Sequence, residues 1–467
     1  SCCLSLLIVS MDATIVNVAL PSIRTDLSAT PAQLQWVVDI YTLVLASLLM
    51  LAGAAGDRLG RRRVFQTGLA IFAFGSLACS LAPSIEALIA ARFVQGIGGS
   101  MLNPVALSII SQIFTGKVER AKALGVWGAV VGISMSLGPI VGGLLIETIS
   151  WRSVFWINLP ICAAAIVLTA VFVPESKSAT MRSVDPIGQL LAVLFLFGVV
   201  YTLIEGPVLG WSNVRVVVSA SVAAVALVAF LRYESRRHDP FLDLRFFRSI
   251  PFTAAVVNAI CAFAAWGAFL FMMSLYLQGE RGFSAMDTGL IYLPIAVGAL
   301  LFSPLSGRLV GRYGARPSLV LAGTLIAGAS TMLTLLTATT PVWWLLIVFA
   351  VFGIGFSMVN APITNSAVSG MPLDRAGAAS AVTSTSRQVG VSIGVALCGS
   401  IAGSAMATGG VDFAATAHPL WFFCIALGLV ILATGLYSTS QRAQRSADQL
   451  APLVLGTDRP AEAADAR

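Results

Sequence analysis

The sequence predicts an all-α integral membrane protein with about fourteen transmembrane helices. Hydrophobic residues make up 57% of its 467 residues, charged residues make up 10%, and the mean hydropathy is +0.90. Apolar runs of roughly 20 residues, the length that crosses about 30 Å of hydrocarbon as a helix, recur along the chain. Because ordinary globular domains carry far more charge, this composition excludes a soluble protein.

Each apolar run is expected to form one helix. We expect these helices at 4–22, 34–56, 63–82, 87–113, 120–147, 153–173, 185–204, 213–232, 250–277, 285–307, 317–337, 341–367, 376–403 and 419–438. The first run contains Asp12 and leads into Pro21 without the basic start or cleavage site of a signal peptide, so we interpret it as a transmembrane helix. Residues 441–467 are polar, rich in alanine and free of aromatic residues, which predicts disorder.

The positive charges predict the orientation of these helices. Of the 28 Lys and Arg residues, 22 fall in alternate loops on one side of the predicted membrane and four on the other. Since positively charged loops stay in the cytosol, both termini are predicted to be cytosolic and the protein to lie in the cytoplasmic (inner) membrane. This dispersal between helices argues against a nucleic-acid partner, which needs a basic patch on one soluble face.

Residues that commonly hold metals or cofactors are scattered. The seven cysteines show no paired spacing, and the two histidines, His238 and His418, lie far apart near loops. The nucleotide-binding pattern GxxxxGK[ST] and the zinc-protease pattern HExxH do not occur. We therefore expect no metal, no cofactor, no enzymatic activity and no direct use of ATP.

An internal repeat divides the chain. Three groups of residues recur in order: Gly53, Arg58, Gly60 and Arg62 as Gly307, Arg312, Gly314 and Arg316; 96–103 as 353–360; and 120–123 as 375–378. Tandem copies of this kind form the two halves of many transporters. We expect a six-helix lobe over 1–175, two inserted helices within 176–237, a second six-helix lobe over 238–440, and a disordered cytosolic tail over 441–467.

The motifs within the first lobe carry a family resemblance. They are Met11-Asp-Ala-Thr-Ile-Val-Asn-Val-Ala-Leu-Pro21, Gly53-Ala-Ala-Gly-Asp-Arg-Leu-Gly-Arg-Arg-Arg63, Arg92-Phe-Val-Gln-Gly-Ile-Gly98, and Gly125 with Ser134, Gly138, Pro139, Gly142 and Gly143. The chain resembles the major facilitator superfamily, in its fourteen-helix EmrB/QacA-type drug/proton antiporter branch. This resemblance implies two lobes that rock about a central site, exposing it alternately to each side of the membrane.

The resemblance also implies gating residues. These are Gly53, Asp57, Arg58, Gly60 and Arg61 in the loop between helices 2 and 3, and Ser134, Gly138, Pro139 and Gly142 in helix 5. Small residues at i, i+4 and i+8 make one face on which another helix packs closely, and by spacing alone static packing is the simpler interpretation. Similarly, arginines in the first motif also serve as a positive-inside anchor. The helix 5 motif is typical of exporters in this superfamily, and here Ser134 stands where that motif has glycine.

Four ionisable residues lie well inside predicted helices, where charge is costly and marks function. Asp12 is roughly 15 Å from the external end of its helix, at 1.5 Å per residue, and is the first candidate for the proton carrier. We expect it to alternate between a protonated form and one paired with Arg92 or a cationic substrate; the alternative is a permanent structural pair. Asp39 is a second candidate for proton or substrate, or else a solvated interfacial carboxylate. Arg387 stands where cation exporters of this branch carry acids, which favours neutral or zwitterionic cargo.

Several polar and aromatic residues are candidates for substrate contact as a set, although packing is the simpler interpretation of each aromatic or amide side chain alone. They are Asp39, Gln95, Trp127, Asn258, Trp266, Asn360, Arg387 and Gln388. The predicted function is proton-coupled antiport that exports small lipophilic drugs, dyes or antibiotics, with protons, a small-molecule substrate and the lipid bilayer as partners of a monomer. The alternatives are a proton-coupled uptake symporter and, less favoured, a membrane enzyme or a non-transporting sensor.

Overall fold

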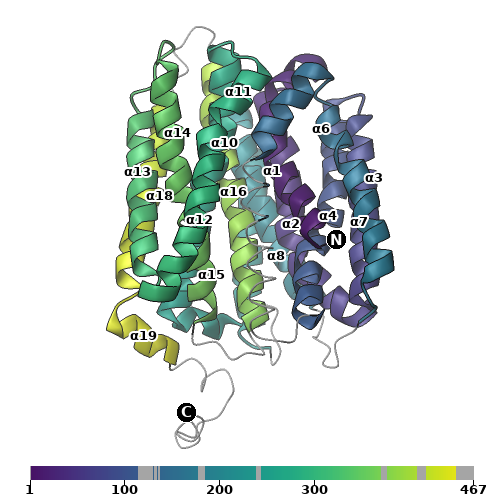
Figure 1. Cartoon of the computed structure of the whole chain (residues 1–467), viewed down its shortest axis with the longest axis vertical. Coiled ribbons are helices and arrows are strands. Elements are labelled where there is room, and N and C mark those ends of the chain that lie inside the picture. Colours follow the sequence, from purple (N-terminus) through teal and green to yellow (C-terminus); the bar gives the residue numbers. More distant parts are fainter. Residues whose placement is uncertain are drawn as a thin grey trace, which may run out of the picture.

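The computed structural model describes residues 2–113, 130, 134, 137–176, 185–237, 243–369, 376–407 and 417–448. Every regular element in these ranges is helical, which confirms the all-α prediction (Figure 1). The first group comprises α1 (Cys2–Leu27), α2 (Pro31–Leu59), α3 (Arg61–Ser80), α4 (Ile85–Ile113), the helix Leu137–Thr148, α6 (Ser153–Trp156) and α7 (Asn158–Phe172). It is followed by the hairpin of α8 (Pro186–Leu209) and α9 (Val214–Glu234).

The second group begins with the short 3-10 helix η1 (Leu244–Arg248). It continues with α10 (Ile250–Leu275), the π-helix η2 (Tyr276–Glu280), α11 (Ala285–Ile291), α12 (Leu293–Tyr313), α13 (Arg316–Leu333), α14 (Val342–Ser357), α15 (Asn360–Val368), α16 (Ala376–Ala407), α18 (His418–Tyr437) and α19 (Gln441–Asp448). Ten helical segments in the described residues are long and apolar enough to cross a membrane. The chain is a multi-pass membrane protein.

Within the described residues the predicted ranges coincide with helices, apart from three breaks and the π-helix η2 that follows α10; of residues 120–136 in the fifth range, only 130 and 134 are described. Single predicted helices are divided between α6 and α7 at Ile157, between α11 and α12 at Tyr292, and between α14 and α15 at Met358–Val359. Proline favours the first turn of a helix, and Pro294 follows the break at Tyr292. At the break before α15, the Ser306 hydroxyl donates to the Met358 carbonyl at 3.0 Å, which satisfies a backbone group that membrane lipid cannot.

The two groups of helices stand side by side, and α8 lies against both (Figure 1). Trp36 of α2 donates its indole N–H to Glu205 of α8 at 2.9 Å. A small apolar cluster fills the space among three helices. It consists of Ala32 and Leu43 of α2, Val200 and Ile204 of α8, and Ala396 of α16. The α8–α9 hairpin therefore covers one side of the junction between the groups.

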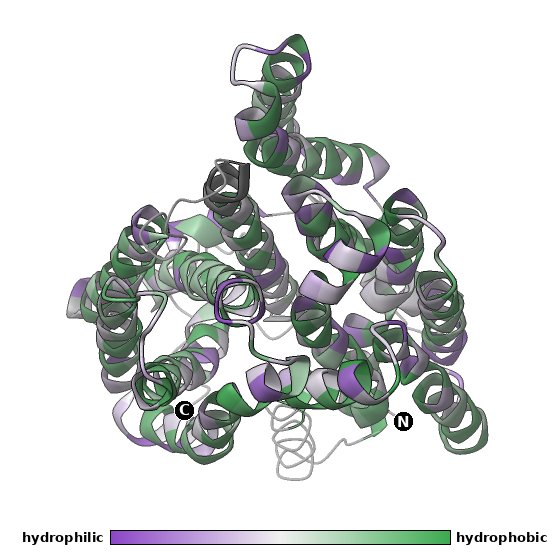
Figure 2. Cartoon of the chain, turned by 90° about the horizontal axis from the view of Figure 1, so that it is seen from above, coloured by the Kyte–Doolittle hydropathy of each residue, from purple (hydrophilic) through white to green (hydrophobic). Residues whose placement is uncertain are grey.

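The outer helices of the bundle also consist largely of hydrophobic residues, as the view from above shows (Figure 2). On α9, Val217, Val218 and Val225 are exposed, whereas Ala223 and Ala226 are buried. A membrane protein exposes apolar residues because hydrocarbon, not water, surrounds it. The lipid-facing surface of the bundle and its interior are therefore similarly apolar in this protein.

The tail departs from the predicted disorder over its first residues. Gln441–Asp448 form α19, which packs on the start of α10, where the Ile250 backbone N–H donates to the Ser446 hydroxyl at 3.0 Å. Ala443 and Ala447 are buried. Two alanines spaced i, i+4 make a small helical face, a local pattern that the average polarity of the segment conceals. The remainder, 449–467, lies outside the described residues.

Candidate functional site

A buried ion pair joins the first and fourth helices. Arg92 of α4 places its Nη1 2.5 Å from Oδ2 of Asp12 on α1, and both side chains are almost completely buried. The two residues that the sequence singled out as costly charges thus compensate one another. A buried pair of this kind holds only when further hydrogen bonds satisfy the remaining polar atoms.

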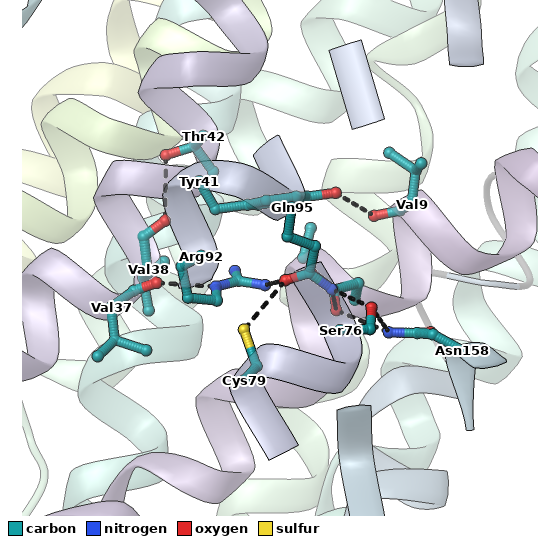
Figure 3. A network of polar contacts seen from close by, with 12 residues as sticks. Val9, Val37, Val38, Tyr41, Thr42, Ser76, Cys79, Arg92, Gln95 and Asn158 are labelled. Carbon is teal, nitrogen blue, oxygen red and sulfur yellow. Dashed lines mark hydrogen bonds and ion pairs between the residues drawn. The ribbon is translucent and has the colours of Figure 1, made fainter. Parts of the chain in front are cut away.

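Those further bonds come from three helices (Figure 3). The other oxygen of Asp12, Oδ1, accepts from the Gln95 side-chain amide at 2.9 Å and from the Asn158 side-chain amide at 3.1 Å. Both amides also donate to the Ser76 hydroxyl of α3, at 2.8 Å and 3.3 Å. Asp12 therefore accepts three hydrogen bonds, a setting that suits the ionised carboxylate.

Helix α2 holds the other side of Arg92. The Arg92 Nε donates to the carbonyl of Val37 at 3.0 Å, and its guanidinium carbon lies 4.1 Å from the centre of the Tyr41 ring. The position of α2 is consequently tied to the position of Arg92. Gln95, a predicted candidate for substrate contact, lies inside this network, where its side-chain oxygen accepts from Arg92 Nη1 at 2.7 Å.

Three partners of the ion pair were not predicted from the sequence: Asn158, Ser76 and Tyr41. Asn158 offered a signal, because it is an amide within the apolar run that begins α7. Ser76 and Tyr41 offered none, since serine and tyrosine commonly occur within membrane helices. Their contribution depends on how α3 and α2 are rotated against α4.

Asp39 has the opposite environment. It is 0% exposed, and neither carboxylate oxygen has a hydrogen-bond partner among the described residues. The alternative of a solvated interfacial carboxylate is therefore wrong for this conformation. A buried carboxylate without a well-placed donor is costly when charged, and the nearby Ser392 hydroxyl offsets only part of that cost, so this setting suits the neutral, protonated acid.

Asp39 belongs to the stripe of α2 that faces α16. One turn toward the predicted external end, the Gln35 amide donates to the carbonyls of Val395 and Ala396 at 2.9 Å and 2.7 Å. On the other side, the hydroxyl oxygens of Thr42 and Ser392 are 2.7 Å apart. We call these α2–α16 contacts the seam; it joins the first group of helices to the second.

Other contacts close the predicted external end. Gln278 of η2 donates to the Val18 carbonyl of α1 at 2.9 Å. The backbone N–H of Met286 on α11 donates to the Glu147 carboxylate at 3.2 Å. Together with the seam, these bonds hold the two groups together on the external side.

Two faces of the helix Leu137–Thr148 have different neighbours. A side-chain carbon at Gly138 would overlap Thr14, and one at Gly142 would overlap Ile15, so this face packs directly on α1 of the same group. The adjacent face meets the second group, because a side chain at Gly143 would overlap the Ala285 carbonyl and one at Gly289 the Pro139 carbonyl. The contact between groups thus uses Pro139 and Gly143, beside the predicted stripe.

Ser134 lies on the predicted stripe with Gly138 and Gly142. Its hydroxyl donates to the Val130 carbonyl one turn earlier, at 2.6 Å, and its side chain is buried. The glycine expected at this position is thus replaced by a residue that satisfies its own polar atom. Gly125, the first residue of the motif, lies outside the described residues.

At the predicted cytosolic end, the loop motif makes contacts within its own group. Asp57 and Arg61 form an ion pair at 2.9 Å, and Arg61 also donates to Gln112 of α4. Gly60 has a φ of 113°, which favours glycine, and a side chain there would overlap the Glu175 carboxylate. Gly53 lies next to Pro104 of α4, and Arg58 lies in the last turn of α2.

The remaining substrate candidates have separate environments. Trp266 is buried and stacks on Phe356, with ring centres 4.4 Å apart, so an internal aromatic cluster occupies one of its faces. Asn258 accepts from the Thr434 hydroxyl at 2.6 Å, which joins α10 to α18. Asn360 and Gln388 are half-buried on α15 and α16, and Trp127 lies outside the described residues.

Arg387 of α16 differs from Arg92 in its partners. Its Nη2 donates to the Thr364 hydroxyl of α15 at 3.0 Å, and its guanidinium carbon lies 5.8 Å from the Phe263 ring centre. Its Nε is buried without a hydrogen-bond partner in the described part of the chain. Within the same part, no three His, Cys, Asp or Glu side chains gather as a metal-binding group.

Comparison with known families decides the identity of this fold. The family model described as Major Facilitator Superfamily matches residues 2–395. The chain belongs to this superfamily. The predicted major facilitator fold is confirmed, and the chain is a transporter, not an enzyme.

Individual members of the superfamily are similar over most of their length. The "Multidrug resistance protein Stp" of Mycobacterium tuberculosis is 37% identical over 398 residues, which cover 85% of this chain and 74% of that protein. The "Tetracenomycin C resistance and export protein" of Streptomyces glaucescens is 35% identical over 396 residues, covering 84% and 73%. A crystal structure of the peptide transporter POT has a TM-score of 0.67 at 15% identity, covering 95% and 94%, and shows the shared superfamily fold.

Proposed function

We propose that this protein is a proton-coupled antiporter of the fourteen-helix EmrB/QacA-type branch, which exports small lipophilic drugs or antibiotics by alternating access. Curated relatives are named for multidrug resistance and for antibiotic resistance and export, and this supports a drug as the substrate. The observation that carries proton coupling is the contrast between two buried carboxylates. Asp12 accepts three hydrogen bonds, whereas Asp39 accepts none from the described residues.

Such a contrast suits proton exchange. Where two titratable groups have opposite environments, one is stabilised as the charged form and the other as the neutral form. In the conformation closed at the external end, we assign the charged form to Asp12 and the protonated form to Asp39. Opening of the seam admits water to Asp39, which removes the cost of its charge and allows a proton to be exchanged.

Helix α2 is the proposed link between the two acids. It carries Asp39 at the seam, and it carries Val37 and Tyr41, which hold Arg92. A movement of α2 that opens the seam therefore changes the support of Arg92. We propose that Asp12 then exchanges Arg92 for a proton or for a cationic group of the substrate, as the sequence predicted.

The experiment measures drug-dependent dissipation of a proton gradient in inside-out vesicles, with a lipophilic rhodamine dye as the drug. We expect Asp12→Asn and Asp39→Asn each to abolish the signal. Asp26→Asn is the matched control, since Asp26 lies on the same helix as Asp12 but at its exposed external end, paired with Arg152. Dye-dependent proton movement that persists in Asp12→Asn would remove Asp12 from the coupling mechanism, and accumulation of dye against the export direction would replace antiport by uptake.

We also propose the division into lobes at 1–175 and 238–440, with the pair within 176–237 inserted between them. The position of α8 against both α2 and α16 supports a peripheral inserted hairpin. The charge distribution supports cytosolic termini in the cytoplasmic membrane. Membrane-impermeant labelling of cysteines introduced at Ser212 and Ser235, in a cysteine-free background, tests this orientation, because these residues flank α9 on opposite sides.

A further inference from the structure

We infer that Arg387 is an anion-binding subsite that selects substrates with a carboxylate or a similar acidic group. This inference rests on the proposed export of small molecules and specifies their chemical class. It begins from the difference between the two arginines buried in the membrane helices. Arg92 is compensated by Asp12, whereas Arg387 has one neutral hydroxyl as its hydrogen-bond partner among the described residues.

Among the described residues, the membrane helices of the second group provide Arg387 with no counter-ion. Helices α10, α12 to α16 and α18 contain no Asp or Glu. The acids of η2 and α11, Glu280 and Asp287, lie at the external end, beside the contacts of Gln278 and Met286. A guanidinium inside a membrane protein is costly unless paired, so an uncompensated one marks a place for a negatively charged ligand.

Arg387 retains donors for such a ligand. A guanidinium has five N–H donors, and Thr364 accepts from one nitrogen, Nη2. The Nε is buried and has no partner in the described residues. The Nε and Nη groups form the planar fork that binds both oxygens of a carboxylate at once, a geometry that lysine cannot reproduce.

Arg387 lies in the predicted cytosolic half of the bundle. Arg387 itself is half-buried, and the neighbouring Thr364 and Asn365 of α15 are exposed. Asn360 lies one turn before Thr364, which donates to its carbonyl. Helix α15 is in the half of the bundle nearer to α19, whereas α11, with its contact to Glu147, lies at the other end (Figure 1). With the proposed orientation, this is the side from which an export substrate approaches.

Phe263, which is buried against Phe356, lies beside the same subsite. Its ring centre is 5.8 Å from the guanidinium carbon of Arg387. A lipophilic acid matches a cation in such apolar surroundings, with its carboxylate at the guanidinium and its apolar body among the neighbouring apolar side chains. An ester of the same molecule retains the apolar contact but loses the charge-assisted bonds.

The test compares rhodamine B, which has a free carboxylate, with rhodamine B ethyl ester. Binding of each dye to the purified full chain in lipid nanodiscs is measured by fluorescence anisotropy, and transport of each is measured separately in vesicles. We expect the wild type to bind the acid tighter than the ester, and Arg387→Gln to weaken binding of the acid about tenfold or more while leaving the ester unchanged. Arg387→Lys retains the charge without the fork and is expected to lose part of the preference.

The outcomes separate the two proposals. Equal affinity of the wild type for acid and ester, or an acid preference that survives in Arg387→Gln, overturns the inference. If Arg387→Gln unfolds, Arg387→Lys decides: it keeps the charge without the fork, and an acid preference as large as that of the wild type overturns the inference. If the acid preference depends on Arg387 in nanodiscs but neither dye is transported, the anion-binding subsite is supported and the proposed export function is rejected.

Discussion

The guanidinium of Arg92 lies 4.1 Å from the centre of the Tyr41 ring, so α2 supports the cation that compensates Asp12. Asp39 is two residues before Tyr41 on the same helix, but its carboxylate belongs to the seam with α16. One helix therefore contacts both the ion pair inside the first group and the junction between the two groups. Alternating access requires such an element, because opening the junction must alter the environment of a proton-binding group.

The ion pair should be strongly coupled in stability. Asp12→Asn or Arg92→Gln alone leaves a buried charge without its partner, and we expect each to lower the free energy of unfolding by about 3–5 kcal/mol. The double variant should lose less than the sum of the single losses. Thermal unfolding of the purified protein in detergent measures this difference, and strictly additive losses would show that the two side chains do not interact.

Tyr41 should support Arg92 through its ring. Tyr41→Leu removes the aromatic face, and we expect a loss of about 1–2 kcal/mol in stability together with slower dye-dependent proton movement. Tyr41→Phe keeps the ring and is the matched control. A similar loss in both variants would instead assign the effect to the phenol hydroxyl, which is 3.5 Å from the Val9 carbonyl.

Closure of the external end should depend on glycine at Gly143 and Gly289. A methyl group at either position overlaps the backbone of the opposite group, so we expect Gly143→Ala and Gly289→Ala to shift the population toward an externally open conformation. Distances between spin labels on α2 and α16 measure that shift. Gly328→Ala is the control, because no atom lies within 4 Å of the added carbon; an unchanged distance distribution in the first two variants would contradict the assignment.

Two glycines related by the internal repeat should differ in their tolerance of a side chain. Gly60 and Gly314 have φ values of 113° and 78°, so alanine strains the backbone at both positions by about 1–3 kcal/mol. At Gly60 the added carbon also overlaps Glu175, whereas at Gly314 it meets nothing within 4 Å. We therefore expect Gly60→Ala to be the more destabilising in thermal unfolding, and Gly60→Ala combined with Glu175→Ala to recover the difference.

The rarity of charge in membrane helices identified the candidate buried charges from the sequence, and the structure showed the surroundings of each. Asp12 and Arg92 could be recognised as candidates because charge is rare in membrane helices, and the structure brings them together. The same rule identified Asp39 as a candidate but did not predict that it is buried, because the exposure of a residue near a helix end depends on which helix covers it. Trp266 was selected for its aromatic ring, and only packing revealed that Phe356 already occupies one face.

The sequence by itself determined that lipid surrounds most of the protein, where the apolar helices lie, and in which order the repeated motifs occur. Hydropathy and charge act locally, because the bilayer imposes the same requirement on every segment that crosses it. Tertiary structure alone decided which faces meet: Asn158 and Ser76 with Asp12, Gly143 with Ala285, and Thr42 with Ser392. The physical reason is that lipid-facing and core-facing surfaces are both apolar, so hydropathy does not define how each helix is rotated against its neighbours.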